Sequence, residues 1–105
     1  MSAKQTVEDA IAGNKIVIFS KSYCPYCRKA KNLLTSDFAH LKDQIYIKEL
    51  DQSPDGREIQ DYLQEKTGQS TVPNIFINQR HVGGCDKVVT LKDGGKLAGL
   101  VEVVS

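Results

Sequence analysis

The stretch IVIFSKSYCPYCRKAKNLL, residues 16–34, joins a buried strand to a helix that carries two cysteines. Residues 16–19 are a short continuous run of apolar, mostly β-branched side chains, which is typical of a strand buried on both faces. Pro25 suits the first turn of a helix, where its missing N–H costs no hydrogen bond. Ala30, Leu33 and Leu34 then give the helix an apolar stripe. A strand followed directly by a cysteine motif and a helix indicates the start of a βαβ unit.

Apolar segments of alternating type continue on both sides of this stretch. The periodicity predicts helices over residues 3–12, from residue 25, from a cap at Ser53 or Asp55 up to Gly68, and around residues 97–104. It predicts strands at residues 16–19, 45–50, 74–78 and 81–82. The short turn at Asn78 and Gln79 joins the last two strands into an antiparallel hairpin. A small mixed sheet covered by helices follows from this order.

The composition is that of an ordinary globular protein. The chain has 105 residues, 40% apolar and 26% charged, which predicts a single domain spanning residues 1–105. A chain of this length buries a core without disulfide staples, so intrinsic disorder, a collagen-like fibre and a disulfide-stapled miniprotein are all disfavoured. We expect a monomer.

The charge balance argues against two classes of partner. Fourteen basic and 13 acidic residues leave a formal net charge of +1, which provides no global field for nucleic acid or an anionic membrane. No stretch approaches the ~20 consecutive apolar residues of a membrane helix. The first fourteen residues contain Glu8 and Asp9 and resemble neither a secretory signal nor a transit peptide. We therefore expect a cytoplasmic protein with no nucleic-acid or membrane partner.

The chain has three cysteines, and this odd number does not fit the paired disulfide framework of a secreted protein. Cys24 and Cys27 are spaced i, i+3, which places both sulfurs on one face of a helix. Cys24 falls near the helix N-cap, where free N–H groups and the helix dipole favour a thiolate. Nearby cations add to this effect: Lys21, Arg28, Lys29 and Lys31. We expect Cys24 to be the attacking thiolate and the less exposed Cys27 to be the resolving thiol.

Three other interpretations of the pair compete with the redox one. The two cysteines could be small packing residues, but the position between strand and helix does not fit inert packing. They could form an inert structural disulfide, which an intracellular protein disfavours. They could form half of a zinc site, for which the other candidate ligands are Cys85, His40 and His81. No second close pair supports zinc, so we expect no bound metal. A C-x-x-C beside a βαβ pattern favours redox chemistry.

Several motifs together resemble one family. The chain is similar over nearly its whole length to dithiol glutaredoxins of the thioredoxin fold, and four segments carry the resemblance: 24–27 (CPYC), 58–68 (EIQDYLQEKTG), 71–73 (TVP) and 83–86 (GGCD). Thioredoxins proper usually have Trp before the first cysteine and Gly-Pro between the two, whereas this chain has no Trp. The resemblance implies a three-layer α/β/α sandwich with a four-stranded mixed sheet.

The resemblance also implies glutathione as co-substrate and assigns residues to one end of it. Lys21 would pair with the glycyl carboxylate, Gln60 would assist at this end, and Tyr26 would pack beside the substrate. Judged from the residues alone, the less favoured alternatives are a solvated lysine at Lys21 and a surface amide at Gln60.

A second group of residues would bind the rest of glutathione. The family implies a cis Val72–Pro73 bond in the Thr71-Val72-Pro73 segment, with the Val72 backbone pairing to the substrate as an added strand does; the residues alone leave a trans turn open. Cys85 and Asp86 open a helix whose start suits the γ-glutamyl carboxylate, and Asp86 would take the ammonium group.

Two residues of this second group have further interpretations. Asp86 could also be a simple N-cap. We interpret Cys85 as a non-catalytic thiol whose backbone touches glutathione. Many family members have a polar or acidic residue where this chain has Lys87, so the charges at this end depart from the family pattern.

The predicted activity is glutathione-dependent thiol–disulfide oxidoreduction. Its substrates would be glutathionylated proteins and protein disulfides, reduced through Cys24 and Cys27. One alternative is a carrier that bridges an iron–sulfur cluster between two protomers through Cys24 and glutathione, against which Pro25 argues. Another is a non-catalytic glutathione-binding module, which the reactive-looking Cys24 disfavours.

Overall fold

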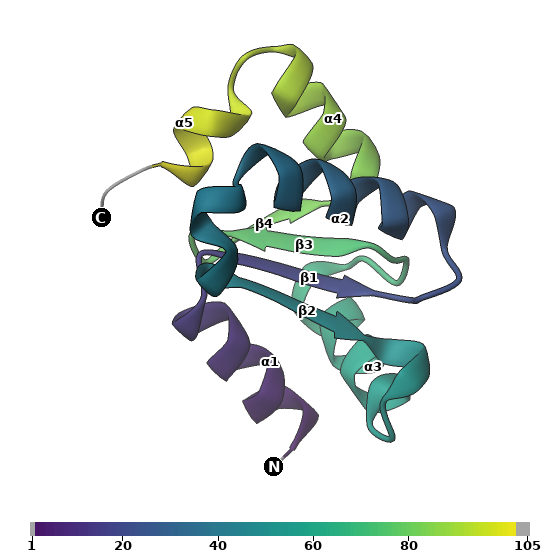
Figure 1. Cartoon of the computed structure of the whole chain (residues 1–105). Helices are drawn as coiled ribbons and strands as arrows, with labels where there is room; N and C mark the ends of the chain where they lie inside the picture. The colour runs from purple at the N-terminus through teal and green to yellow at the C-terminus, as the bar shows by residue number, and fades with distance from the viewer. Residues whose placement is uncertain (1, 103–105) are drawn as a thin grey trace.

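A four-stranded mixed sheet forms the centre of the computed structural model, which describes residues 2–102. The strands are β1 (Ile16–Ser20), β2 (Ile45–Glu49), β3 (Asn74–Ile77) and β4 (Arg80–Gly83), in the order β2-β1-β3-β4. β1 is parallel to β2 and antiparallel to β3, and β3 and β4 form the predicted hairpin (Figure 1). Asn78 and Gln79 turn it with φ values of 50° and 68°, the left-handed geometry of a two-residue hairpin turn. The expected mixed sheet is confirmed.

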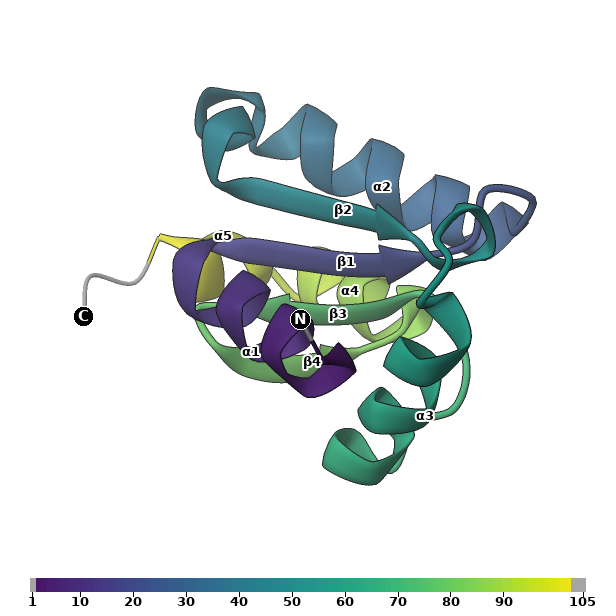
Figure 2. The same cartoon turned by 90° about the horizontal axis from the view of Figure 1, so that it is seen from below.

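Helices cover both faces of the sheet and make three layers, as predicted (Figures 1 and 2). One face carries α2 (Pro25–Asp37), α4 (Cys85–Asp93) and α5 (Leu97–Val101). The other carries α1 (Ala3–Gly13) and α3 (Gly56–Thr67). None of the helices within residues 2–102 has the length and apolar character required to traverse a bilayer.

The continuous apolar run of β1 is explained by its central position. Ile16 and Ile18 pack in the core under α2, whereas Val17 and Phe19 pack in the core under α1 and α3. Successive side chains of a strand point to opposite faces, so a central strand needs apolar residues at every position. The last residue, Ser20, is fully buried as well, on the α2 side.

The structure differs from the predicted elements in the second quarter of the chain. Two short 3₁₀ helices occupy Ala39–Gln44 and Leu50–Gln52, so β2 ends at Glu49 and Leu50 is not part of the strand. Asp55 holds the N-cap position of α3 but makes no capping bond, because its carboxylate accepts from the Ser53 hydroxyl instead. Asp55 is therefore the N-cap residue, as predicted, but neither Ser53 nor Asp55 makes a side-chain capping hydrogen bond.

The α3 start and the C-terminal end show two further features. Gly56 lies so close to the Leu50 carbonyl that a Cβ would collide with it, and this contact requires glycine at the first position of α3. The C-terminal apolar spacing forms α5, which ends at Val101; the predicted continuation to Val104 lies outside the described residues.

Candidate active site

Cys24 is the N-cap residue of α2, as the sequence predicts. Its Sγ accepts a hydrogen bond of 3.3 Å from the Cys27 N–H, and Pro25 occupies the first helical position. The extended backbone of Cys24 turns the chain out of β1 and aims its sulfur at the free N–H groups of the first helical turn. Cys24 is half-buried, so a disulfide can reach its sulfur.

The surroundings of Cys24 favour its thiolate. Burial alone would raise the pKa of this thiol, but hydrogen bonds from the Cys27 thiol and from the Cys27 and Tyr26 N–H groups outweigh burial. The positive charge of Lys31 adds to them. The pKa of Cys24 is consequently below its usual value, which is the condition for a nucleophilic cysteine near neutral pH.

Cys27 has the opposite character. It is fully buried on the inner face of α2, and this burial raises the pKa of its thiol to about 11. The Lys21 N–H lowers the pKa of Cys27, whereas the neighbouring Cys24 raises it. Two thiols whose pKa values are shifted in opposite directions therefore lie on one helical turn. The thiol at the helix start is the better nucleophile.

The segment at residues 70–73 lies beside Cys24. The Val72–Pro73 peptide bond is cis, as the family resemblance implied. Cys24 Sγ lies 3.9 Å from the Val72 carbonyl oxygen, and the Val72 N–H has no acceptor within residues 2–102. An extended peptide that approaches Cys24 thus meets an open backbone edge at Val72.

A cavity of about 590 Å³ begins at this edge and brings together six of the predicted binding residues. They are Tyr26, Thr71, Val72, Pro73, Cys85 and Asp86. Gly83 also lines the cavity; its φ of 128° is one that residues with a Cβ rarely adopt. Tyr26 is 62% exposed, so its ring is accessible to a ligand beside the cysteine motif.

Two predicted binding residues lie outside this cavity. Lys21 is half-buried directly after β1, and its carbonyl accepts from the Cys24 N–H at 3.1 Å. Gln60 lies on α3, and its Nε2 donates to the Ser70 carbonyl at 2.8 Å. Gln60 therefore supports the loop that leads to Thr71.

The start of α4 corrects one interpretation of Asp86. Gly84 is the N-cap of this helix, and Asp86 stands exposed in its first turn, so Asp86 is not the cap. Its carboxylate remains free to face a cation in the cavity. Cys85 is buried, which raises the pKa of its thiol, and this is the behaviour of a thiol that does not act as a nucleophile.

Comparison with known proteins agrees with this geometry. The family model described as Glutaredoxin matches residues 16–82, more than half of the chain. Glutaredoxin-1 of Rhizophagus irregularis is 51% identical over 98 residues, which cover 93% of either chain. The chain belongs to the glutaredoxin family.

Solved structures share both sequence and fold with this glutaredoxin. The buckwheat glutaredoxin–glutathione complex is 41% identical with a TM-score of 0.84, covering 94% of this chain and 86% of that one. The holo form of glutaredoxin C1 from Populus tremula x tremuloides is 37% identical with a TM-score of 0.86, covering 95% of each. The predicted thioredoxin-like fold, the dithiol motif and the oxidoreductase class are confirmed.

Gln69 is a site residue that the sequence did not single out. Its Nε2 donates to the Thr71 carbonyl at 3.0 Å and to the Pro73 carbonyl at 2.9 Å, so one amide holds both sides of Val72. Its Oε1 accepts from His81 Nε2 at 3.2 Å. The only signal in the sequence is a long amide shortly before the TVP segment, which does not reveal its partners.

We expect Gln69→Ala to raise the KM for a glutathionylated substrate about three- to tenfold, because loss of the two hydrogen bonds that hold the Val72 edge should weaken binding by about 1 kcal/mol in total. Steady-state kinetics at varied substrate concentration measure this. Gln64→Ala, an exposed amide on α3, is the matched control and should keep the parental KM. An unchanged KM in Gln69→Ala would contradict the role of this side chain.

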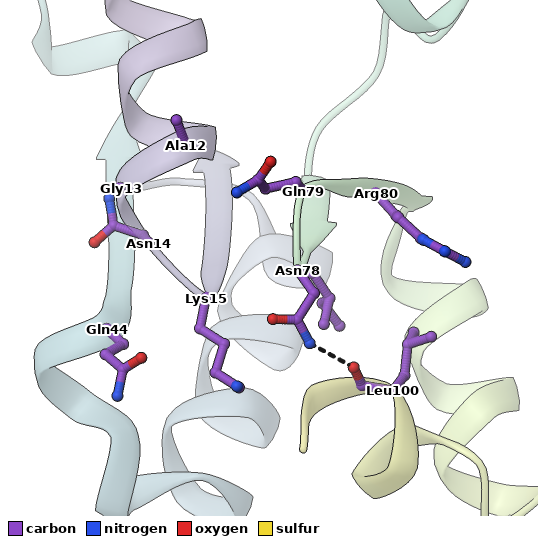
Figure 3. A pocket seen from close by; sticks show the side chains of 10 residues that line it. Ala12, Gly13, Asn14, Lys15, Gln44, Asn78, Gln79, Arg80 and Leu100 are labelled. Carbon is purple, nitrogen blue, oxygen red and sulfur yellow. Dashed lines mark hydrogen bonds between the residues drawn. The ribbon is translucent and has the colours of Figure 1, made fainter. Parts of the chain in front are cut away.

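A second cavity of about 580 Å³ lies at the opposite end of the sheet (Figure 3). Lys15, Gln44 and Arg80 line it, and the Asn78 amide donates to the Leu100 carbonyl there at 2.7 Å. No predicted site residue lines this cavity. Within residues 2–102, no three His, Cys, Asp or Glu side chains are grouped so that they could hold a metal ion.

Proposed function

We propose that this glutaredoxin reduces mixed disulfides between glutathione and proteins, and also protein disulfides, with Cys24 as nucleophile and Cys27 as resolving thiol. The observation that carries this proposal is the pair of unequal thiols at the start of α2, beside the open backbone edge of Val72. A low-pKa thiol supplies the attacking sulfur, and a buried one stays protonated until a disulfide forms next to it.

Glutathione would lie along the cavity at residues 71–73 and 83–86. The Val72 N–H and carbonyl would pair with the cysteinyl backbone of glutathione, with Tyr26 beside it. Asp86 would face the γ-glutamyl ammonium group, and Lys21 the glycyl carboxylate at the other end. A solved relative, 41% identical, is a complex with glutathione, which supports a site for this tripeptide here.

The reaction proceeds by thiol–disulfide exchange. The Cys24 thiolate attacks the glutathione sulfur of a glutathionylated protein, the old S–S bond breaks, and the protein leaves as a thiolate that takes up a proton. Cys24 then carries glutathione. A second glutathione thiolate attacks this adduct, which regenerates Cys24 and releases glutathione disulfide.

Protein disulfides follow a related route. Cys24 forms a mixed disulfide with the protein, and Cys27 displaces the protein to give the Cys24–Cys27 disulfide. We place this chemistry in the cytoplasm, where glutathione keeps thiols reduced, and in a monomer, since every proposed site residue comes from one chain.

The test is a glutathione-coupled reduction assay on Lys21→Ala and Asp86→Ala. Each variant should raise the KM for the glutathionylated substrate about three- to tenfold, less at high salt, because one charge-assisted contact is lost. Lys42→Ala and Asp93→Ala remove exposed charges elsewhere and are the matched controls. Kinetics unchanged in both site variants would overturn the proposed orientation of glutathione, and absence of any turnover by the parent chain would overturn the function.

A further inference from the structure

His81 lies on the edge strand β4, directly opposite Phe76 of β3. Its ring packs on Phe76 with the ring centroids 5.2 Å apart, which restricts the orientation of the imidazole. Asn74 lies two residues before Phe76 and therefore on the same face of the sheet. His81 Nε2 lies 2.9 Å from Asn74 Oδ1 and 3.2 Å from Gln69 Oε1, so one ring nitrogen contacts two side-chain amides.

Gln69 connects His81 to the open backbone edge at Val72. Its Nε2 donates to the Thr71 and Pro73 carbonyls on either side of Val72. A side-chain amide donates from its nitrogen and accepts at its oxygen. Because the nitrogen of Gln69 is used by the two carbonyls, only its Oε1 is left for His81, and this oxygen requires a donor there.

The two amides determine where the imidazole proton lies. Gln69 Oε1 and Asn74 Oδ1 are both acceptors, so His81 Nε2 must carry a hydrogen. Partial removal of the ring from water lowers the pKa of His81 below its usual value, which favours the neutral ring near neutral pH. A neutral ring has one N–H, and these contacts place it on Nε2 and leave Nδ1 unprotonated.

The orientation of the Asn74 amide follows from the same hydrogen. Asn74 is only 1% exposed, and its Nδ2 is buried with no acceptor within residues 2–102. If the amide were turned over, Nδ2 would face the N–H of His81, donor against donor. The bond to His81 therefore orients Asn74, and Asn74 in turn anchors the imidazole to the buried start of β3.

We propose that His81 is a positioning residue for the substrate: its Nε2–H, anchored on Asn74, orients the Gln69 amide that holds the Val72 edge. The inference rests on the proposed function, because it concerns the edge at which the cysteinyl backbone of glutathione would pair. His81 does not line the cavity beside Cys24, so it acts through Gln69.

The test replaces the imidazole by two side chains that differ in their donor. His81→Phe keeps an aromatic ring that can pack on Phe76 but has no N–H. His81→Gln carries a terminal amide that can donate to Gln69. His40→Phe is the matched control, since His40 is a 60% exposed histidine in the first 3₁₀ helix.

We expect His81→Phe to raise the KM for a glutathionylated peptide about two- to fivefold, because one hydrogen bond that orients Gln69 is lost. The kcat should stay within about a factor of two, because neither Cys24 nor Cys27 is changed. His81→Gln should restore the parental KM, and His40→Phe should keep it. Thermal unfolding checks that each variant is folded.

A double-mutant cycle separates action through Gln69 from a general loosening of β4. In a chain that already carries Gln69→Ala, His81→Phe should raise the KM no further, because the amide that His81 orients is absent. A rise of the same size in both backgrounds would overturn the proposal, since His81 would then act independently of Gln69.

Nitrogen NMR of the imidazole gives a readout that altered packing alone would not produce. Near neutral pH, the His81 ring should carry its proton on Nε2 and none on Nδ1. The His40→Phe variant assigns the signal, because His81 is then the single histidine of the chain. A proton on Nδ1 in place of Nε2 would overturn the proposal, since Nε2 could then donate to neither amide.

A parental KM in His81→Phe would overturn the positioning role, and so would a KM in His81→Gln as high as in His81→Phe. If the parent does not turn over a glutathionylated peptide at all, the proposed function fails, and the positioning role with it. Normal turnover by the parent together with an unchanged KM in His81→Phe would overturn the positioning role alone.

Discussion

Replacement of Cys24 by serine is expected to lower the turnover of every disulfide substrate by at least about 10³-fold, because a serine hydroxyl is not ionised at neutral pH and forms no exchangeable disulfide. Coupled assays with a glutathionylated peptide and with a protein disulfide measure the loss. Serine keeps the N-cap function of Cys24, so the fold should be retained. A variant that keeps a tenth of the parental rate on either substrate would contradict the role of Cys24.

The same assignment predicts the order in which the thiols react. The pKa of Cys24 is lowered, chiefly because hydrogen bonds at the helix start outweigh burial, whereas burial raises the pKa values of Cys27 and Cys85. As pH falls below neutral, the thiolate fraction of Cys24 should persist longest. Alkylation at mildly acidic pH, followed by peptide mass mapping, should therefore label Cys24 first. Earlier labelling of Cys85 would show that the low-pKa thiol is wrongly assigned.

Replacement of Cys27 by serine is expected to separate the two activities. Removal of glutathione from a glutathionylated substrate needs one thiolate, because free glutathione resolves the Cys24 adduct, so this activity should be kept or raised. Direct reduction of a protein disulfide also uses the internal thiol and should fall at least about 100-fold. Parallel assays with the two substrate types measure the split.

A trapped intermediate gives an independent check on the Cys27→Ser variant. With the internal route closed, Cys24 should hold one glutathione, seen as a mass increase that a reductant reverses. If Cys27→Ser were as inactive as Cys24→Ser on glutathionylated substrates, the two-role scheme would be wrong. Cys27 would then be a second essential group or a structural requirement of the site.

The elements that carry the reactive thiols could be predicted from local patterns. Apolar residues at every position of 16–19 indicate a central strand, and Pro25 and the i, i+3 cysteines indicate a helix start. Asp55 as the N-cap of α3 could be predicted as well, but its lack of a capping hydrogen bond could not, since two neighbouring side chains can bond each other as well as the helix.

The binding surface was predictable in part only. Family resemblance supplied the TVP and GGCD segments, and the structure brings both to one cavity beside Cys24. It did not indicate Gln69, because an amide before a turn has many possible partners within reach. The carbonyls of Thr71 and Pro73 become those partners only when the chain folds back on itself.

The sequence by itself determined which residues have redox chemistry and which elements carry them, because helix starts, buried strands and the i, i+3 spacing depend on neighbours along the chain. Only the tertiary structure decided that Ser20, Glu49 and Lys31 meet. They come from two strands and a helix, and their meeting depends on the parallel register of β1 and β2 and on the side of the sheet that α2 covers. Register and layer packing join residues far apart in the chain, and no local pattern of side chains specifies such a contact.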